Sequence, residues 1–144
     1  MTQNAFAYHA NQAYRGAAVA VPPLRAVVML LNGAITFLQK SLDAQEARRF
    51  EEAHENMTRA TAILRGLSHH LDSNRGGTVA ERLFGTYNAL IMACLRAYGR
   101  PRMRRSYLRI MSSLAELRDA WSDVDTQQAR SAKRSGGTDS VARK

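Results

Sequence analysis

The chain has 144 residues, of which 45% are apolar, and this size fits one domain with a real hydrophobic core. Its net charge of +9 attracts acidic partners but does not choose between nucleic acid, membrane and acidic protein. No apolar run approaches the roughly 18 residues that cross a bilayer, and the N-terminal residues lack the pattern of a signal peptide. We therefore expect a cytoplasmic protein without membrane insertion.

The secondary structure predicted from composition is helical throughout. Only three prolines occur, and the alternation of β-branched residues that is typical of strands is missing. Residues 1–21 form a polar, alanine-rich N-terminal arm with two tyrosines, Tyr8 and Tyr14, and no clear helical repeat. Pro22 and Pro23 then indicate a helix start, because a proline at the first helical position loses no hydrogen bond.

The first two helices are predicted over residues 24–42 and 44–71. Each carries one apolar stripe at helical spacing, which predicts one buried side. The stripe of the first helix is Val27, Leu31, Ala34, Leu38 and Leu42, and that of the second is Phe50, Ala53, Met57, Ala60, Leu64, Leu67 and Leu71.

The segment 72–77, Asp-Ser-Asn-Arg-Gly-Gly, is the strongest helix breaker in the chain. Thr78 is the predicted N-cap of a third helix, and Glu81, three residues on, completes a capping box. The stripe of this helix is Val79, Leu83, Tyr87, Leu90, Cys94 and Ala97. Gly99 and Pro101 indicate where it ends.

The fourth helix has the most regular apolar stripe in the sequence: Met103, Tyr107, Ile110, Leu114, Leu117, Trp121 and Val124. Short connections between amphipathic helices favour antiparallel neighbours. We therefore expect an all-α fold, an antiparallel four-helix bundle over residues 22–128. Residues 129–144 contain almost no apolar side chains and are predicted to be a disordered basic tail.

The sequence shows no pattern that is typical of catalysis, of a metal site or of a cofactor site. Cys94, the single cysteine, lies on an apolar stripe, where a thiol behaves as a small hydrophobe. His69 and His70 are adjacent and point in different directions on a helix, so they do not match a metal-binding pair. We expect no enzyme activity, no metal and no cofactor.

Six arginines surround the predicted turn between the third and fourth helices: Arg96, Arg100, Arg102, Arg104, Arg105 and Arg109. Such a cluster is able to hold phosphates, so a nucleic-acid-binding bundle is an alternative. However, no nucleic-acid-binding module is readable, and no aromatic residues are interleaved for base stacking. We expect no nucleic-acid partner and favour a solvated patch or one that faces an acidic protein.

Three helices carry a second apolar row beside the core stripe. The rows are Val28, Ile35 and Phe37 in the first helix, Phe84, Ile91 and Leu95 in the third, and Leu108, Met111 and Ala115 in the fourth. Two interpretations are open, because wide rows either make a thick core or leave an exposed groove for a partner helix.

Three motifs together resemble the flagellar secretion chaperone family FliS. They are the run Pro-Pro-Leu-Arg-Ala-Val-Val-Met-Leu-Leu-Asn-Gly-Ala-Ile over 22–35, the spacing Leu-Asp-x-x-x-Gly-Gly-x-x-Ala-x-x-Leu-x-x-x-Tyr over 71–87, and Leu-Ala-Glu-Leu-Arg-Asp-Ala-Trp over 114–121. Each motif is weak alone, but the three occur in order. The resemblance covers roughly residues 14–124 and implies the same four-helix bundle.

The resemblance also implies a function without catalysis. It predicts that the chain binds the disordered C-terminal segment of flagellin, prevents its early polymerisation and delivers it to the flagellar export apparatus. It further implies that the N-terminal arm, with Tyr8 and Tyr14, covers part of the groove until the client displaces it. The expected client groove consists of Leu31, Ile35, Phe84, Tyr87, Ile91, Leu95, Leu108 and Met111. A bundle that acts as a helical adaptor for another subunit is the alternative within protein binding.

Overall fold

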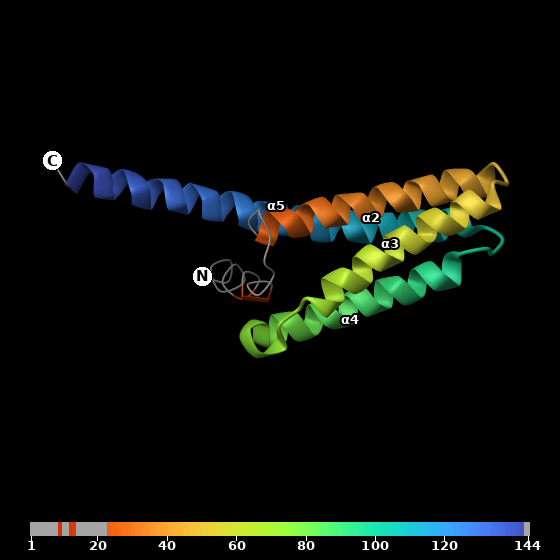
Figure 1. The fold of residues 1–144 in the computed structure, drawn as a ribbon, viewed down its shortest axis with the longest axis horizontal. Coiled ribbons are helices and arrows are strands. Elements are labelled where there is room, and N and C mark those ends of the chain that lie inside the picture. The colour runs from red at the N-terminus through yellow and green to blue at the C-terminus, as the bar shows by residue number, and fades with distance from the viewer. Residues whose placement is uncertain (1–8, 10–11, 14–22, 143–144) are drawn as a thin grey trace.

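The computed structural model describes residues 9, 12–13 and 23–142, with the backbone alone for Pro23, Ser73 and residues 136–142. Four helices make up the bundle: α2 (Pro23–Glu46), α3 (Phe50–His69), α4 (Ser73–Ala97) and α5 (Met103–Ala142). Figure 1 shows that each helix runs in the opposite direction to the one before it. Tyr8 and Tyr14 of the predicted arm lie outside the described residues.

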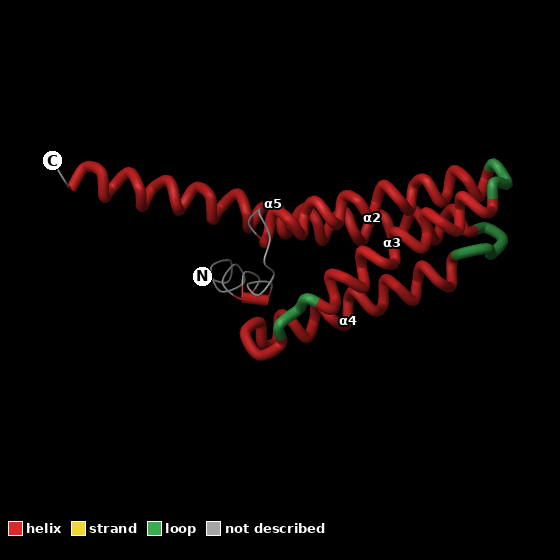
Figure 2. Tube along the Cα trace, in the orientation of Figure 1, coloured by secondary structure: helices red, strands yellow, loops and turns green. Residues whose placement is uncertain are grey.

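The helices form the all-α bundle that the sequence predicts. α2 packs against α3 and α5, and α4 packs against α3 and less extensively against α5. Figure 2 shows that α4 diverges from α5 toward the end where α3 meets α4. The prediction of an antiparallel four-helix bundle is confirmed.

The turn between α2 and α3 is one that the sequence prediction missed. Arg48 has a φ of 61°, and the backbone N–H of Arg49 donates to the carbonyl oxygen of Ala44 at 2.8 Å. This left-handed helix ending normally uses glycine or asparagine, so an arginine there gives no signal in the sequence. The predicted start of the second helix at Ala44 is wrong, because Ala44 belongs to the last turns of α2.

The turn into α4 is closed by a side chain that the prediction did not select. Oδ1 of Asp72 accepts hydrogen bonds from the backbone N–H groups of Asn74 at 3.0 Å and Arg75 at 3.2 Å. The helix therefore begins at Ser73 and is kinked at Gly77, whose φ of 57° favours glycine. Thr78, the predicted N-cap, follows the kink, but the side-chain cap that the structure shows is that of Asp72.

α5 differs from its prediction at the C-terminal end. The sequence predicts a disordered tail from residue 129, whereas α5 continues to Ala142 and extends beyond the rest of the bundle in Figure 1. The described side chains from Ala129 to Ser135 are all exposed, so no core holds them. From Gln127 to Arg134 most residues are glutamine, alanine, arginine or lysine, which favour helix, and a formed helix gains one backbone bond for each added residue.

The core consists of the predicted stripes. Trp121, Tyr87 and Tyr107 are the largest fully buried side chains. Phe50 is the exception among the stripe residues, because it is half exposed at the first position of α3. The other stripe residues are buried or half-buried, which confirms the helical spacing as the signal for burial.

Polar contacts tie three helices together near the two turns at one end of the bundle. Oγ of Ser41 on α2 donates to the carbonyl oxygen of Ala53 on α3 at 2.8 Å and lies 3.1 Å from the Tyr107 hydroxyl on α5. Burial raises the pKa of Tyr107 above its usual value, so the hydroxyl stays protonated. Nη1 of Arg104 lies 2.7 Å and 3.0 Å from the two carboxylate oxygens of Glu46. These contacts join α2, α3 and α5 at this end of the bundle.

Candidate functional site

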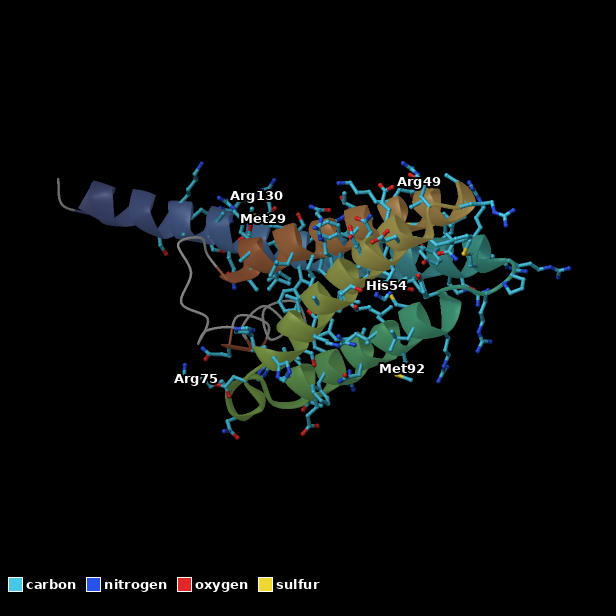
Figure 3. All side chains as sticks on the ribbon, turned by 45° about the vertical axis from the view of Figure 1, so that its right-hand side comes forward. Met29, Arg49, His54, Arg75, Met92 and Arg130 are labelled. Atoms are coloured by element: carbon cyan, nitrogen blue, oxygen red, sulfur yellow. The ribbon has the colours of Figure 1, made fainter. Side chains whose placement is uncertain are left out.

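Large apolar side chains are exposed on several helices, and α4 carries a group of them. Phe84 is 56% exposed, Leu95 is 50% exposed, and Leu108 on α5 is 46% exposed. Met92 on α4 is also about half exposed and points away from the bundle in Figure 3. Single exposed hydrophobes are ordinary, but a group on one helix indicates a surface for a partner.

Two exposed residues of α4 and one buried residue between them form a strip along one side of the helix. Phe84, Ile91 and Leu95 are seven and four residues apart, which places them on the same side. Ile91 is 7% exposed and forms the buried base of the strip. Asn88 lies between them and donates from Nδ2 to the carbonyl oxygen of Phe84 at 2.8 Å, so its amide is satisfied within the helix. We name Phe84, Ile91 and Leu95 the α4 strip.

The α4 strip ends in a depression at the junction of α3 and α4. Phe84 lines this depression, whose volume is about 390 Å³. The other lining residues are Ser68, His69, Leu71, Ala80 and Glu81. The strip therefore continues from an exposed helix side into a hollow between two helices.

The second row of α5 is exposed at one residue only. Leu108 is exposed, Met111 is only 8% exposed, and Ala115 is half-buried. The depression between α4 and α5 is lined by neither Leu95 nor Leu108. The exposed apolar surface therefore includes the α4 strip and Leu108 on α5.

Five residues of the expected groove lie deeper than expected: Leu31, Ile35, Tyr87, Ile91 and Met111. Leu31 and Tyr87 have no exposed surface and belong to the core, and Ile35 is half-buried beside it. Leu31 and Tyr87 therefore lie beneath the surface and are not part of the site proposed below. Both belong to core stripes in the sequence, so the signal for their burial was present.

Sequence analysis missed Met92 as a surface residue. Met92 lies three residues before Leu95, so the two are neighbours on the outer side of α4. This spacing is the signal that could have identified it. A flexible thioether beside a strip is well suited to contacts with a variable partner.

One residue of the N-terminal arm is packed against the start of α4. Ala13 is fully buried, and its carbonyl oxygen accepts a hydrogen bond from the backbone N–H of Asp72 at 2.9 Å. A Cβ added at Gly76 would lie 3.1 Å from Cβ of Ala13 and 2.6 Å from Cβ of Ala80. The absence of a side chain at Gly76 therefore provides the space in which Ala13 lies.

The described part of the chain has neither a metal-binding cluster nor a membrane-spanning helix. There, no three histidine, cysteine, aspartate or glutamate side chains gather in a way that could hold a metal ion. No helix among these residues is both long and apolar enough to cross a membrane. Cys94 is buried, and burial raises the pKa of its thiol to about 11, so the reactive thiolate is scarce at neutral pH.

Comparison with known families agrees with the architecture. The sequence model of the flagellar protein FliS matches residues 5–128. The chain belongs to the FliS family. The match spans the arm and the bundle, and it confirms the resemblance that three short motifs indicate in the sequence.

Membership of the FliS family supports a general role as a flagellar chaperone. No curated protein sequence matched the chain. For a FliS-family bundle, the exposed apolar surface is the feature with the most direct functional meaning, because a chaperone must cover apolar segments of its client.

Proposed function

We propose that this protein binds the disordered C-terminal segment of flagellin in the cytoplasm, prevents its premature polymerisation and delivers it to the flagellar export apparatus. The observation that supports the proposal best is the α4 strip, with Phe84 and Leu95 half exposed on one side of a helix. Family membership supports the choice of client.

The size of the α4 strip suits one short client helix. Phe84 and Leu95 are eleven residues apart on α4, a distance of roughly 16 Å along the helix axis at 1.5 Å per residue. A client helix of about three turns presents its apolar residues over the same length. The depression beside Phe84 accepts one further apolar side chain at the end of that helix.

Leu108 supplies a second and separate contact. Because the strip lies on α4 and Leu108 lies on α5, a client that covers both contacts two helices. A segment that is disordered when free loses conformational entropy on binding, which lowers its net affinity. The bound segment is therefore protected from premature polymerisation, and its lowered affinity allows it to be released.

The N-terminal arm competes with the client in this proposal. Ala13 lies against Gly76, and Gly76 is one helical turn from Ala80, which lines the depression beside Phe84. Ala13 is therefore held close to one end of the proposed client surface. If the arm covers this surface for part of the time, the client binds only to the uncovered fraction of molecules. The apparent client affinity is then the intrinsic affinity multiplied by that fraction.

Two alternatives are distinguished by simple measurements. A helical adaptor for another subunit would use the same strip but would not bind flagellin. A nucleic-acid-binding bundle would use the arginine cluster, and its affinity would fall steeply with added salt. Client binding through apolar burial changes little with salt.

The proposal is tested by placing charges in the α4 strip. The double variant Phe84→Glu/Leu95→Glu is expected to bind a labelled C-terminal flagellin peptide at least about tenfold more weakly, because its carboxylates would have to be buried against an apolar helix face. Fluorescence anisotropy measures the dissociation constant, and circular dichroism checks that helicity is retained.

The matched control is Thr86→Glu/Ala89→Glu. It adds the same two charges at exposed positions of α4 outside the strip. We expect the control to bind as the unmodified protein does. Equal affinities for the two double variants would contradict the assignment of the strip, and no binding of flagellin by the unmodified protein would contradict the choice of client.

A further inference from the structure

The distribution of charge along the chain is uneven. Between Glu81 and Glu116 no aspartate or glutamate occurs, while seven arginines do. This stretch covers most of α4, the turn that follows and the first part of α5. Six of these seven arginines lie in the last turns of α4, the turn that follows and the first turns of α5.

Arg104 forms an ion pair within the bundle, whereas other arginines of this group do not. Arg104 is paired with Glu46 on α2 at 2.7 Å. Within the described part of the chain, Arg96, Arg100 and Arg109 make no ion pair. Three exposed guanidinium groups thus retain their capacity to bind carboxylates.

These three arginines surround a depression between α4 and α5 with a volume of about 290 Å³. α4 and the turn contribute Ala93, Arg96, Ala97, Arg100 and Pro101, and α5 contributes Met103, Ser106, Arg109 and Ile110. Ala97 and Ile110 are buried and form part of its floor. The site combines an apolar floor with a basic rim and one hydroxyl group.

We propose that this depression, with Arg96, Arg100 and Arg109 at its rim, is a docking site for an acidic peptide segment of a partner protein. The segment carries one aliphatic or aromatic side chain between glutamates or aspartates. Its apolar side chain occupies the floor. Each carboxylate accepts two parallel N–H hydrogen bonds from one guanidinium group, which is the geometry that arginine favours.

Charge and lining together favour a peptide over a nucleic acid. No aromatic side chain lines the depression, so it offers no platform for base stacking. Phosphate binding needs positive charge but no apolar floor. A peptide with mixed acidic and apolar residues is complementary to both parts of the site.

The site is distinct from the proposed client surface. None of Phe84, Leu95 and Leu108 lines it. A charge reversal at its rim therefore leaves the α4 strip unchanged, and the failure of one proposal does not imply the failure of the other.

The experiment uses a short fluorescein-labelled peptide in which one leucine is flanked by glutamates, added to the full-length protein. The double variant Arg100→Glu/Arg109→Glu is expected to bind this peptide at least about tenfold more weakly than the unmodified protein. The control Arg65→Glu/Arg82→Glu has the same net charge, changes exposed arginines outside the depression, and is expected to retain most of the affinity. Replacing the leucine of the peptide by glycine should also weaken binding.

Three outcomes would overturn the proposal. Equal loss in both double variants would show attraction by net charge alone. Tighter binding of a single-stranded oligonucleotide, abolished by Arg100→Glu/Arg109→Glu, would assign the site to nucleic acid. A dimer of the unmodified protein in analytical ultracentrifugation that this variant dissociates would show that a second copy occupies the depression.

Discussion

Trp121 is the residue whose burial the sequence predicts most directly, because it lies on the most regular apolar stripe. The structure places it among the largest fully buried side chains of the bundle. Ile91 and Leu95 show the limit of such reasoning. They are four residues apart in the same row, yet one is buried and the other half exposed. Helical spacing fixes which side a residue is on, but the depth of burial depends on how closely the neighbouring helix approaches.

Trp121→Ala should lower the free energy of unfolding by about 3–5 kcal/mol, because removing a buried indole leaves a large cavity. Urea denaturation followed by circular dichroism measures this loss. Ala120→Ser, a change at an exposed neighbouring position, provides the control and should shift the free energy by less than about 0.5 kcal/mol. A loss below about 1 kcal/mol for Trp121→Ala would contradict the placement of the indole in the core.

Cys94 should not react with a thiol reagent at neutral pH until the protein unfolds, because the thiol is buried and its pKa is raised to about 11. The unfolded chain loses this proton near pH 9, and the folded chain keeps it until about pH 11. Stability from this group is therefore complete below pH 9 and is lost as the pH rises toward 11. Cys94→Ala should flatten that part of the stability profile, and an unchanged slope would contradict the prediction.

At the scale of the helices, the chemical signals of the sequence predicted some boundaries and not others. Pro22 and Pro23 correctly indicated the start of α2, and Pro101 and Gly99 the end of α4. The turn at Arg48 was not predictable, because its left-handed backbone is stabilised by hydrogen bonds and not by the residue type. The extension of α5 was also missed, because helix propagation needs no apolar stripe.

Gly76→Ala should release the N-terminal arm from α4. The new methyl group would approach Cβ atoms of Ala80 and Ala13 too closely to fit without movement. Limited proteolysis should then cleave the arm faster, and the apparent affinity for the flagellin peptide should rise. Gly85→Ala is the matched control, since nothing lies within 4 Å of its added Cβ, and it should stabilise α4 by about 0.5–1 kcal/mol. The same proteolysis rate in both variants would argue against the arm contact.

Removal of residues 129–144 should leave the stability of the bundle unchanged within about 0.5 kcal/mol. The described side chains from Ala129 to Ser135 are all exposed, so their removal deletes no core contact. Thermal unfolding of the shortened and full-length proteins measures the difference. A large loss of stability would show that the C-terminal part of α5 supports the bundle and would contradict the predicted domain boundary at residue 128.

At the scale of the whole molecule, the second apolar rows predicted which residues are candidates for the surface but not how they are arranged. Of the residues expected in the groove, Phe84, Leu95 and Leu108 are exposed, whereas Leu31 and Tyr87 are buried in the core. The angle at which helices pack decides this arrangement, and no local pattern encodes it. The sequence also did not indicate which arginine of the cluster forms an ion pair. Arg104 and Glu46 are far apart in the sequence, and only the fold brings them together.

The most direct test of the proposed function is hydroxyl-radical footprinting of the protein with and without the flagellin peptide. Binding should reduce oxidation of Phe84, Leu95 and Leu108, which are exposed in the free protein. Phe50 is similarly exposed outside the proposed surface and should be oxidised equally in both samples. Protection of these three residues with no change at Phe50 is the predicted result. Full oxidation of Phe84 and Leu95 in the complex would contradict the claim that the client covers the α4 strip.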